Sequence, residues 1–127
     1  IRATARRCLD VIRFQVEAVE RETEIVPGVS VVPAPGHTPG HLAILIASEG
    51  EQLLNVADAA AHPVHLEEPL WQSGFDLAPA DACATRRALM ERAIAGNMHV
   101  MAFHFPFPSV GRISPQATGG WQWTPGW

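Results

Sequence analysis

The chain has 127 residues, which is enough for one small domain with a modest hydrophobic core. Its formal net charge is −4 and arginine supplies every fixed positive charge, so the composition argues against a nucleic-acid-binding protein. No apolar run approaches the ~18 residues that would indicate a membrane span. Cys8 and Cys83 match no Cys-x-x-Cys pattern, so we expect free thiols and a cytoplasmic location, unless a signal peptide precedes Ile1.

The first third of the chain is predicted to hold a helix and then a strand. Apolar residues recur at helical spacing between Arg2 and Ile12, which predicts a short amphipathic helix. The acidic stretch of residues 14–24 fits either a strand or a helix end, with its glutamates facing solvent. Pro27-Gly28 indicates a turn, and the β-branched residues that follow predict a strand up to residue 33.

A hairpin is predicted in the middle of the chain. Residues 41–48 are apolar almost throughout, so we expect a strand that is covered on both faces. Residues 49–51 form a turn, and residues 52–56 return as the second strand.

A long helix and further strands are predicted in the second half. The helix begins at Asp76 or Pro79 and has Gly96 as its expected C-cap. Its apolar spacing places Arg86 on the solvent face. The next apolar strand is expected at residues 99–103, and short edge strands are expected at residues 112–113 and 121–124.

The loop between the strands ending at 33 and starting at 41 contains Pro35-Gly36-His37-Thr38-Pro39-Gly40-His41. Proline fixes φ and glycine permits unusual dihedrals, so this loop can hold an imidazole still, as a metal ligand requires. For an isolated Gly-His-Thr the alternative is a turn whose histidine faces solvent. The whole heptad resembles the third metal motif of the metallo-β-lactamase-fold hydrolases.

Two later residues fit the same resemblance. Asp58 stands where the strand 52–56 ends, and functional groups often collect at strand ends, although an aspartate there could also cap a turn. His104 follows the strand 99–103 and opens the segment Phe105-Pro106-Phe107-Pro108, although it could also be packed and hydrogen-bonded. The resemblance implies that Asp58 bridges two metal ions and that His37 and His104 hold one each.

Four further residues are candidates for the surroundings of this site. The family pattern places the metal on His37, so His41 is expected to support a ligand or simply to pack. His62 could line the pocket or lie on the surface. Phe105 and Phe107 could form an apolar pocket wall, as binding clefts often have, or belong to the core.

The resemblance covers about residues 29–111 and implies an α/β fold. It implies half of a metallo-β-lactamase-like αβ/βα sandwich, with a mixed, mostly antiparallel sheet and packed helices. The family's HxHxDH motif is absent from the sequence, and that motif normally supplies further ligands. Residues 1–127 are therefore expected to be a single partial domain, the C-terminal portion of the fold, completed by a missing N-terminal half or a homo-oligomer partner.

The function implied by the resemblance is metal-dependent hydrolysis of a small molecule. A metal-bound hydroxide would attack an ester, lactone, thioester or related bond, with Asp58 as the catalytic residue and two zinc ions as the cofactor. Iron or manganese are alternatives, because the same donors accept several ions. The intact protein is expected to be an enzyme and the fragment alone inactive. The rival expectations are a non-catalytic half-domain with a packing or oligomerisation role, and an iron-binding oxidoreductase of the same fold.

Overall fold

A computed structural model describes residues 2–117 and 119–127 of the chain. The helices are α1 (Arg2–Ile12), α2 (Val64–Glu67) and α3 (Pro79–Ala95), with a 3-10 turn η1 (Ala57–Ala59). The strands are β1 (Thr23–Val26), β2 (Val29–Pro33), β3 (Leu42–Ser48), β4 (Glu51–Asn55), β5 (His99–Met101), β6 (Val110–Pro115) and β7 (Trp121–Pro125). The expected α/β class is confirmed, and α2 is a short helix that was not predicted.

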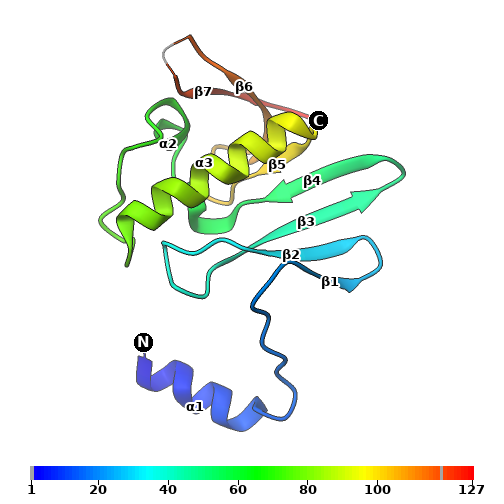
Figure 1. Ribbon diagram of the computed structural model, residues 1–127, viewed down its shortest axis with the longest axis vertical. Helices are drawn as coiled ribbons and strands as arrows, with labels where there is room; N and C mark the ends of the chain where they lie inside the picture. The colour runs from blue at the N-terminus through cyan, green and yellow to red at the C-terminus, as the bar shows by residue number, and fades with distance from the viewer. Residues whose placement is uncertain (1, 118) are drawn as a thin grey trace.

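The strands form one sheet in chain order, from β1 to β7 (Figure 1). Neighbouring strands are antiparallel, except that β4 and β5 run parallel and are joined through α3. A parallel pair requires such a crossover, and both of its strands end at the same sheet edge. The end of β2 and the start of β3 lie at that edge too, because both pairings leading to β4 are antiparallel.

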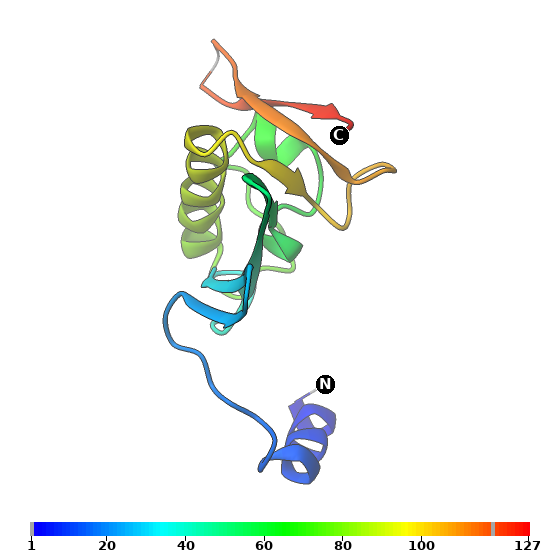
Figure 2. The same ribbon diagram turned by 90° about the vertical axis from the view of Figure 1, so that its right-hand side faces the viewer.

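The core lies between α3 and one face of the sheet (Figure 2). Ala43, Leu45, Leu54 and Val100 point to this face and are at most 8% exposed. They alternate along their strands with residues of the other face, as the period-2 geometry of strands requires. The apolar stripe of α3 packs on them through Leu89, Met90 and Ala93.

The C-terminus of α3 differs in detail from the expected glycine cap. Gly96 has φ −87°, and the left-handed residue is Asn97 at φ 47°. Asparagine tolerates that conformation better than most residues, so it takes the role that glycine usually has.

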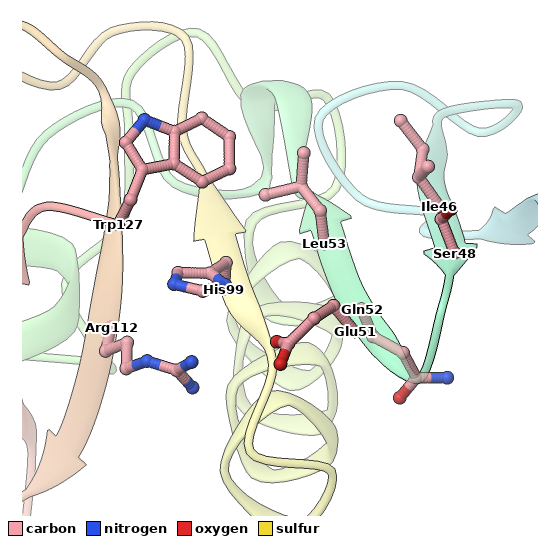
Figure 3. Close-up of a pocket in the computed structure, with 8 residues that line it drawn as sticks. All are labelled: Ile46, Ser48, Glu51, Gln52, Leu53, His99, Arg112 and Trp127. Atoms are coloured by element: carbon pink, nitrogen blue, oxygen red, sulfur yellow. The ribbon is translucent and has the colours of Figure 1, made fainter.

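The opposite face of the sheet is open where β3 to β6 run. Ile44 and Ile46 are 36% and 40% exposed, so the expectation that residues 41–48 are covered on both faces is wrong for this chain. A hollow of about 470 Å³ lies on this face. Its lining residues are Ile46, Ser48, Glu51, Gln52, Leu53, His99, Arg112 and Trp127, drawn in Figure 3.

Helix α1 forms where it was predicted but lies apart from the sheet (Figure 1). Leu9 is 51% exposed, and Phe14 just beyond the helix is 87% exposed. A helix of 11 residues is marginal in water unless its apolar stripe packs against something. Among the described helices, none is long and apolar enough to cross a membrane.

Candidate metal centre

His37, Asp58 and His104 meet at the sheet edge where β2, β4 and β5 end. The Nε2 atom of His37 lies 4.0 Å from Oδ2 of Asp58, and Nε2 of His104 lies 2.9 Å from Oδ1 of the same carboxylate. The three residues border a pocket of about 500 Å³. The rest of its lining is Ala61, Ser73 and Phe75.

His37 reaches the pocket from the loop between β2 and β3. Its Nδ1 lies 3.0 Å from Oδ1 of Asp76, and a carboxylate accepts hydrogen bonds, so Nδ1 is the protonated nitrogen. In the neutral form of the ring, Nε2 is then the nitrogen that carries the lone pair, and it faces Asp58. Asp76 was not among the predicted site residues, because an acidic residue just before Pro79 has the usual signature of a helix start.

Asp58 is held by the turn that follows β4. Ala57 has a positive φ of 45°, and its N–H donates to Oδ1 of Asn55 over 3.0 Å. The backbone N–H of Asp58 donates to Nε2 of His41 over 3.1 Å, and Nδ1 of His41 donates to the Ala34 carbonyl over 2.9 Å. Both nitrogens of His41 are therefore used within the protein, and this histidine supports the backbone of Asp58.

His104 follows β5 directly and is the most exposed of the three. Its side chain is 46% exposed, against 27% for His37 and 40% for Asp58. The ring packs edge-to-face on Phe103, with 5.1 Å between the ring centroids. The remaining open side of the pocket therefore lies around His104.

The donor set fits part of a metal centre. Imidazole nitrogens and a carboxylate are ligands that zinc accepts, and the two imidazoles face different oxygens of Asp58, as suits a carboxylate that bridges two cations. Within residues 2–117 and 119–127, no three or more His, Cys, Asp or Glu side chains are grouped closely enough to hold a metal ion as they stand. Three ligands also cannot fill two tetrahedral coordination shells.

The structure does not bring the other candidate residues into the pocket. The Nδ1 atom of His62 accepts the backbone N–H of Val64 over 3.1 Å, and the residue is exposed. Phe105 is 5% exposed and packs edge-to-face on Trp123, so it belongs to the core instead of the pocket wall. Phe107 is 95% exposed and is not a lining residue. The phenylalanine that does line the pocket is Phe75, which was not among the predicted site residues.

Arg86 holds the backbone next to Asp58 in place. It is buried, so its predicted position on the solvent face is wrong. It is 1% exposed, because backbone carbonyls collect around its guanidinium group. The Nε atom donates to the carbonyl of Ala59, next to Asp58, over 2.8 Å, and Nη1 donates to the carbonyls of Pro69 and Trp71. This side chain therefore ties the Asp58 turn to the segment leading to the pocket wall.

No protein-family model matches the chain, but it is similar to individual proteins in sequence and in structure. An N-acyl homoserine lactonase from a Bacillus species is 42% identical over 60 residues, which are 46% of this chain and 24% of that protein. The solved structure of AidC, described as a dizinc quorum-quenching lactonase, is 25% identical with a TM-score of 0.85. The match covers 94% of this chain and 41% of AidC.

A third similarity concerns the fold. The structure of AbOPH, described as a hydrolase in the beta lactamase superfamily, matches with a TM-score of 0.77 at 22% identity, covering 92% of this chain and 41% of that one. The chain thus spans about a quarter of the curated lactonase and about two-fifths of each solved structure. The sheet and the structural similarities show that the chain has part of a metallo-β-lactamase-like fold, and the similar proteins are described as lactonases and hydrolases.

Proposed function

We propose that this chain contributes His37, Asp58 and His104 to the two-zinc centre of a hydrolase that opens lactones. The observation that carries the proposal is the convergence of these three side chains, from three separate segments, on one pocket. The similarity to lactonases, one of which is described as dizinc, supports both the metal and the type of bond. It favours hydrolysis over the iron-dependent redox alternative.

The proposal assigns a role to each residue. When bound, zinc supplies Lewis acidity, which makes water nucleophilic near neutral pH and stabilises negative charge on a carbonyl oxygen. His37, Asp58 and His104 would hold the zinc ions, and the Asp58 carboxylate would be shared between them. In the reaction, the oxygen of water bonds to the lactone carbonyl carbon, the ring C–O bond breaks, and the ring oxygen leaves as an alcohol.

The pocket wall indicates a small substrate with an apolar part. Phe75 is 84% exposed and lines the pocket beside His37 and Asp58. Binding clefts combine such apolar surface with a few polar groups that orient the ligand. We infer that Phe75 contacts the acyl portion of a lactone while its carbonyl faces the two histidines.

The remaining metal ligands come, in this proposal, from an upstream portion of the same polypeptide. The matched structures are more than twice as long as the part that this chain covers, which favours one longer chain over two copies of this one. The open sheet face offers the surface on which such a portion packs, because Ile44 and Ile46 are uncovered there. Residues 1–127 are then one partial domain.

The test uses the full polypeptide, with zinc content measured by metal analysis and N-acyl homoserine lactone opening measured by proton release. Replacing Asp58 or His37 with alanine is expected to lower turnover by about 100-fold or more, as loss of a charge-stabilising group does. Asp81→Asn is the control, because Asp81 is an exposed acid in the first turn of α3, outside the pocket lining. Full turnover in zinc-free protein, or in Asp58→Ala, would refute the proposal.

The open face also supports the rival, a non-catalytic half-domain that associates through it. Sedimentation of the 127-residue chain, with zinc titration, separates the two. A chain that dimerises, and a full polypeptide that neither binds zinc nor opens lactones, would favour the rival.

A further inference from the structure

We propose that Asp76 is the positioning residue of His37, fixing the ring so that Nε2 is the metal donor. The inference rests on the proposed function for the identity of the metal ligand, but the placement of Asp76 stands on its own contacts. Its side chain is 2% exposed, and its Oδ1 accepts the Nδ1–H of His37 over 3.0 Å. A buried carboxylate is costly unless hydrogen bonds compensate for the lost water, so this contact is needed for burial.

The second oxygen of Asp76 anchors the pocket wall. Its Oδ2 accepts the backbone N–H of Ser73 over 3.3 Å, and Ser73 and Phe75 line the pocket. One carboxylate therefore joins the proposed metal ligand to the segment that meets the substrate. Displacing it would disturb both the ligand and the wall.

The usual role of an acid before a helix does not account for Asp76. Helix α3 begins at Pro79, and its N-cap Ala78 makes no side-chain capping bond. An acid in this region commonly caps the helix through the first backbone N–H groups. Here the described hydrogen bonds of the carboxylate go to His37 and Ser73 instead.

The backbone around His37 is fixed to the same segment. The N–H of Leu77 donates to the His37 carbonyl over 3.1 Å, and the N–H of Ala78 donates to the Gly36 carbonyl over 2.9 Å. Gly36 has φ +136°, and a Cβ there would lie 2.2 Å from the backbone nitrogen of Ala82. The backbone of the loop is thus fixed by the two residues before α3 and by the start of that helix, and the direction of the imidazole is left for Asp76 to set.

The hydrogen bond from His37 to Asp76 decides which ring nitrogen is left to bind a metal. Because a carboxylate only accepts, the Nδ1 of His37 keeps its proton and the lone pair of Nε2 faces Asp58. Groups that orient a ligating histidine in this way typically change metal affinity by about 10–100-fold when removed. Asp76 acts through His37, since it does not itself border the pocket.

The test compares Asp76→Ala, Asp76→Asn and Asp81→Asn in the full polypeptide. The first readout is the tautomer of His37 in metal-free protein labelled with ¹⁵N-histidine, its resonances identified by their loss in His37→Gln. Wild type and Asp81→Asn are expected to show the Nδ1–H form, and Asp76→Ala a mixture of both tautomers. An unchanged Nδ1–H form in Asp76→Ala would overturn the proposal.

The second readout is zinc affinity, measured by competition with a chromophoric chelator. Asp76→Ala is expected to weaken zinc binding about 10–100-fold, and Asp76→Asn, which keeps the shape and one acceptor, about tenfold. Affinity equal to that of Asp81→Asn in both variants would overturn the proposal. If Asp76→Ala fails to fold by circular dichroism, the isosteric Asp76→Asn decides. If the wild-type protein binds no zinc, the proposed function is refuted. The tautomer of His37 in metal-free protein would then still decide whether Asp76 positions the ring.

Discussion

The two faces of the sheet carry similar side chains but differ in how they are buried. Leu45 is 8% exposed on the face under α3, whereas its neighbours Ile44 and Ile46, on the other face, are 36% and 40% exposed. Each face is apolar enough to form a core, and the chain supplies a covering layer for one. The other face stays open and carries the hollow beside His99 and Trp127 (Figure 3).

The difference in burial between the two faces separates what the 127 residues stabilise by themselves from what they leave exposed. The covered face fixes the strands and brings three site residues together at one edge. The open face leaves apolar surface in water, at a cost of roughly 25 cal/mol for each Å² that a partner could bury. The Nε2 atom of His99, on that face, is buried and has no hydrogen-bond partner among the described residues.

The largest expected effect comes from shortening a leucine on each face. Leu54→Ala on the covered face, where Leu54 is 0% exposed, should lower the free energy of unfolding by about 2–5 kcal/mol. Leu53→Ala on the open face should cost under about 1 kcal/mol in the 127-residue chain, because less surface is buried there. Urea unfolding measures both. Equal losses of unfolding free energy in the two variants would show that the two faces are equally buried. A larger loss for Leu53→Ala in the full polypeptide would show that the open face is covered there.

A polar group in the covered layer should give the next largest effect. Arg86→Met leaves the Ala59, Pro69 and Trp71 carbonyls without their donor and should cost about 2 kcal/mol of unfolding free energy. Arg87→Met is the matched control, because Arg87 is half exposed and its ion pair with Glu91 is long at 3.6 Å. Denaturant unfolding should separate the neighbours clearly, and similar values for both would show that Arg86 is replaceable.

His65 makes the covered layer sensitive to pH. Burial lowers the pKa of its imidazole from the usual 6.5, and Arg86 lowers it further, against a raising effect from Asp76. The unfolded chain then takes up the proton at a higher pH than the folded one, so stability is full above about 6.5 and falls as pH drops towards the folded pKa. Unfolding between pH 5 and 8 should show this slope. It should flatten in His65→Asn, which can still accept the Ala61 N–H, and an unchanged slope would assign it elsewhere.

The smallest effect is expected from a surface ion pair at the edge of the covered layer. Arg92 makes two 2.7 Å bonds to Glu22, and this contact lowers the pKa of the Glu22 carboxyl from 4.5. Both side chains are partly exposed, so Glu22→Gln should cost only about 0.5 kcal/mol at neutral pH. The loss should disappear as pH falls through the lowered pKa, because the wild-type carboxyl is then neutral too. A cost well above 1 kcal/mol would mean that the pair holds the segment before β1 in place.

Most of the strand pattern could be predicted from the sequence. The β-branched run of residues 29–33 and the apolar run of residues 41–48 are strands because their side chains suit a pleated, packed surface. The apolar spacing of residues 79–95 predicted α3. What local pattern could not predict is which strand face α3 would cover, since residues 41–48 are apolar on both sides.

The candidate site was predictable only in part. His37, Asp58 and His104 were selected on the resemblance and on their positions at strand ends, and the structure places them around one pocket. Their role as metal ligands stays a prediction. Asp76 and Arg86 were missed because their roles depend on contacts across 39 and 27 residues of sequence, which local pattern does not record. Phe105 was left as either pocket wall or core, because nothing in the neighbouring sequence showed that Trp123 would pack on it.

The parallel pairing of β4 and β5 has a consequence for the order in which the pocket can assemble. Asp58 and His104 are 46 residues apart and become neighbours only after α3 has crossed back over the sheet. Contacts of such long range close slowly, because loop entropy is lost before they form. During synthesis, a chain that has emerged through η1 already contains His37 and Asp58 but lacks His104. The pocket can therefore assemble only after β5 and the residues that follow it have been made.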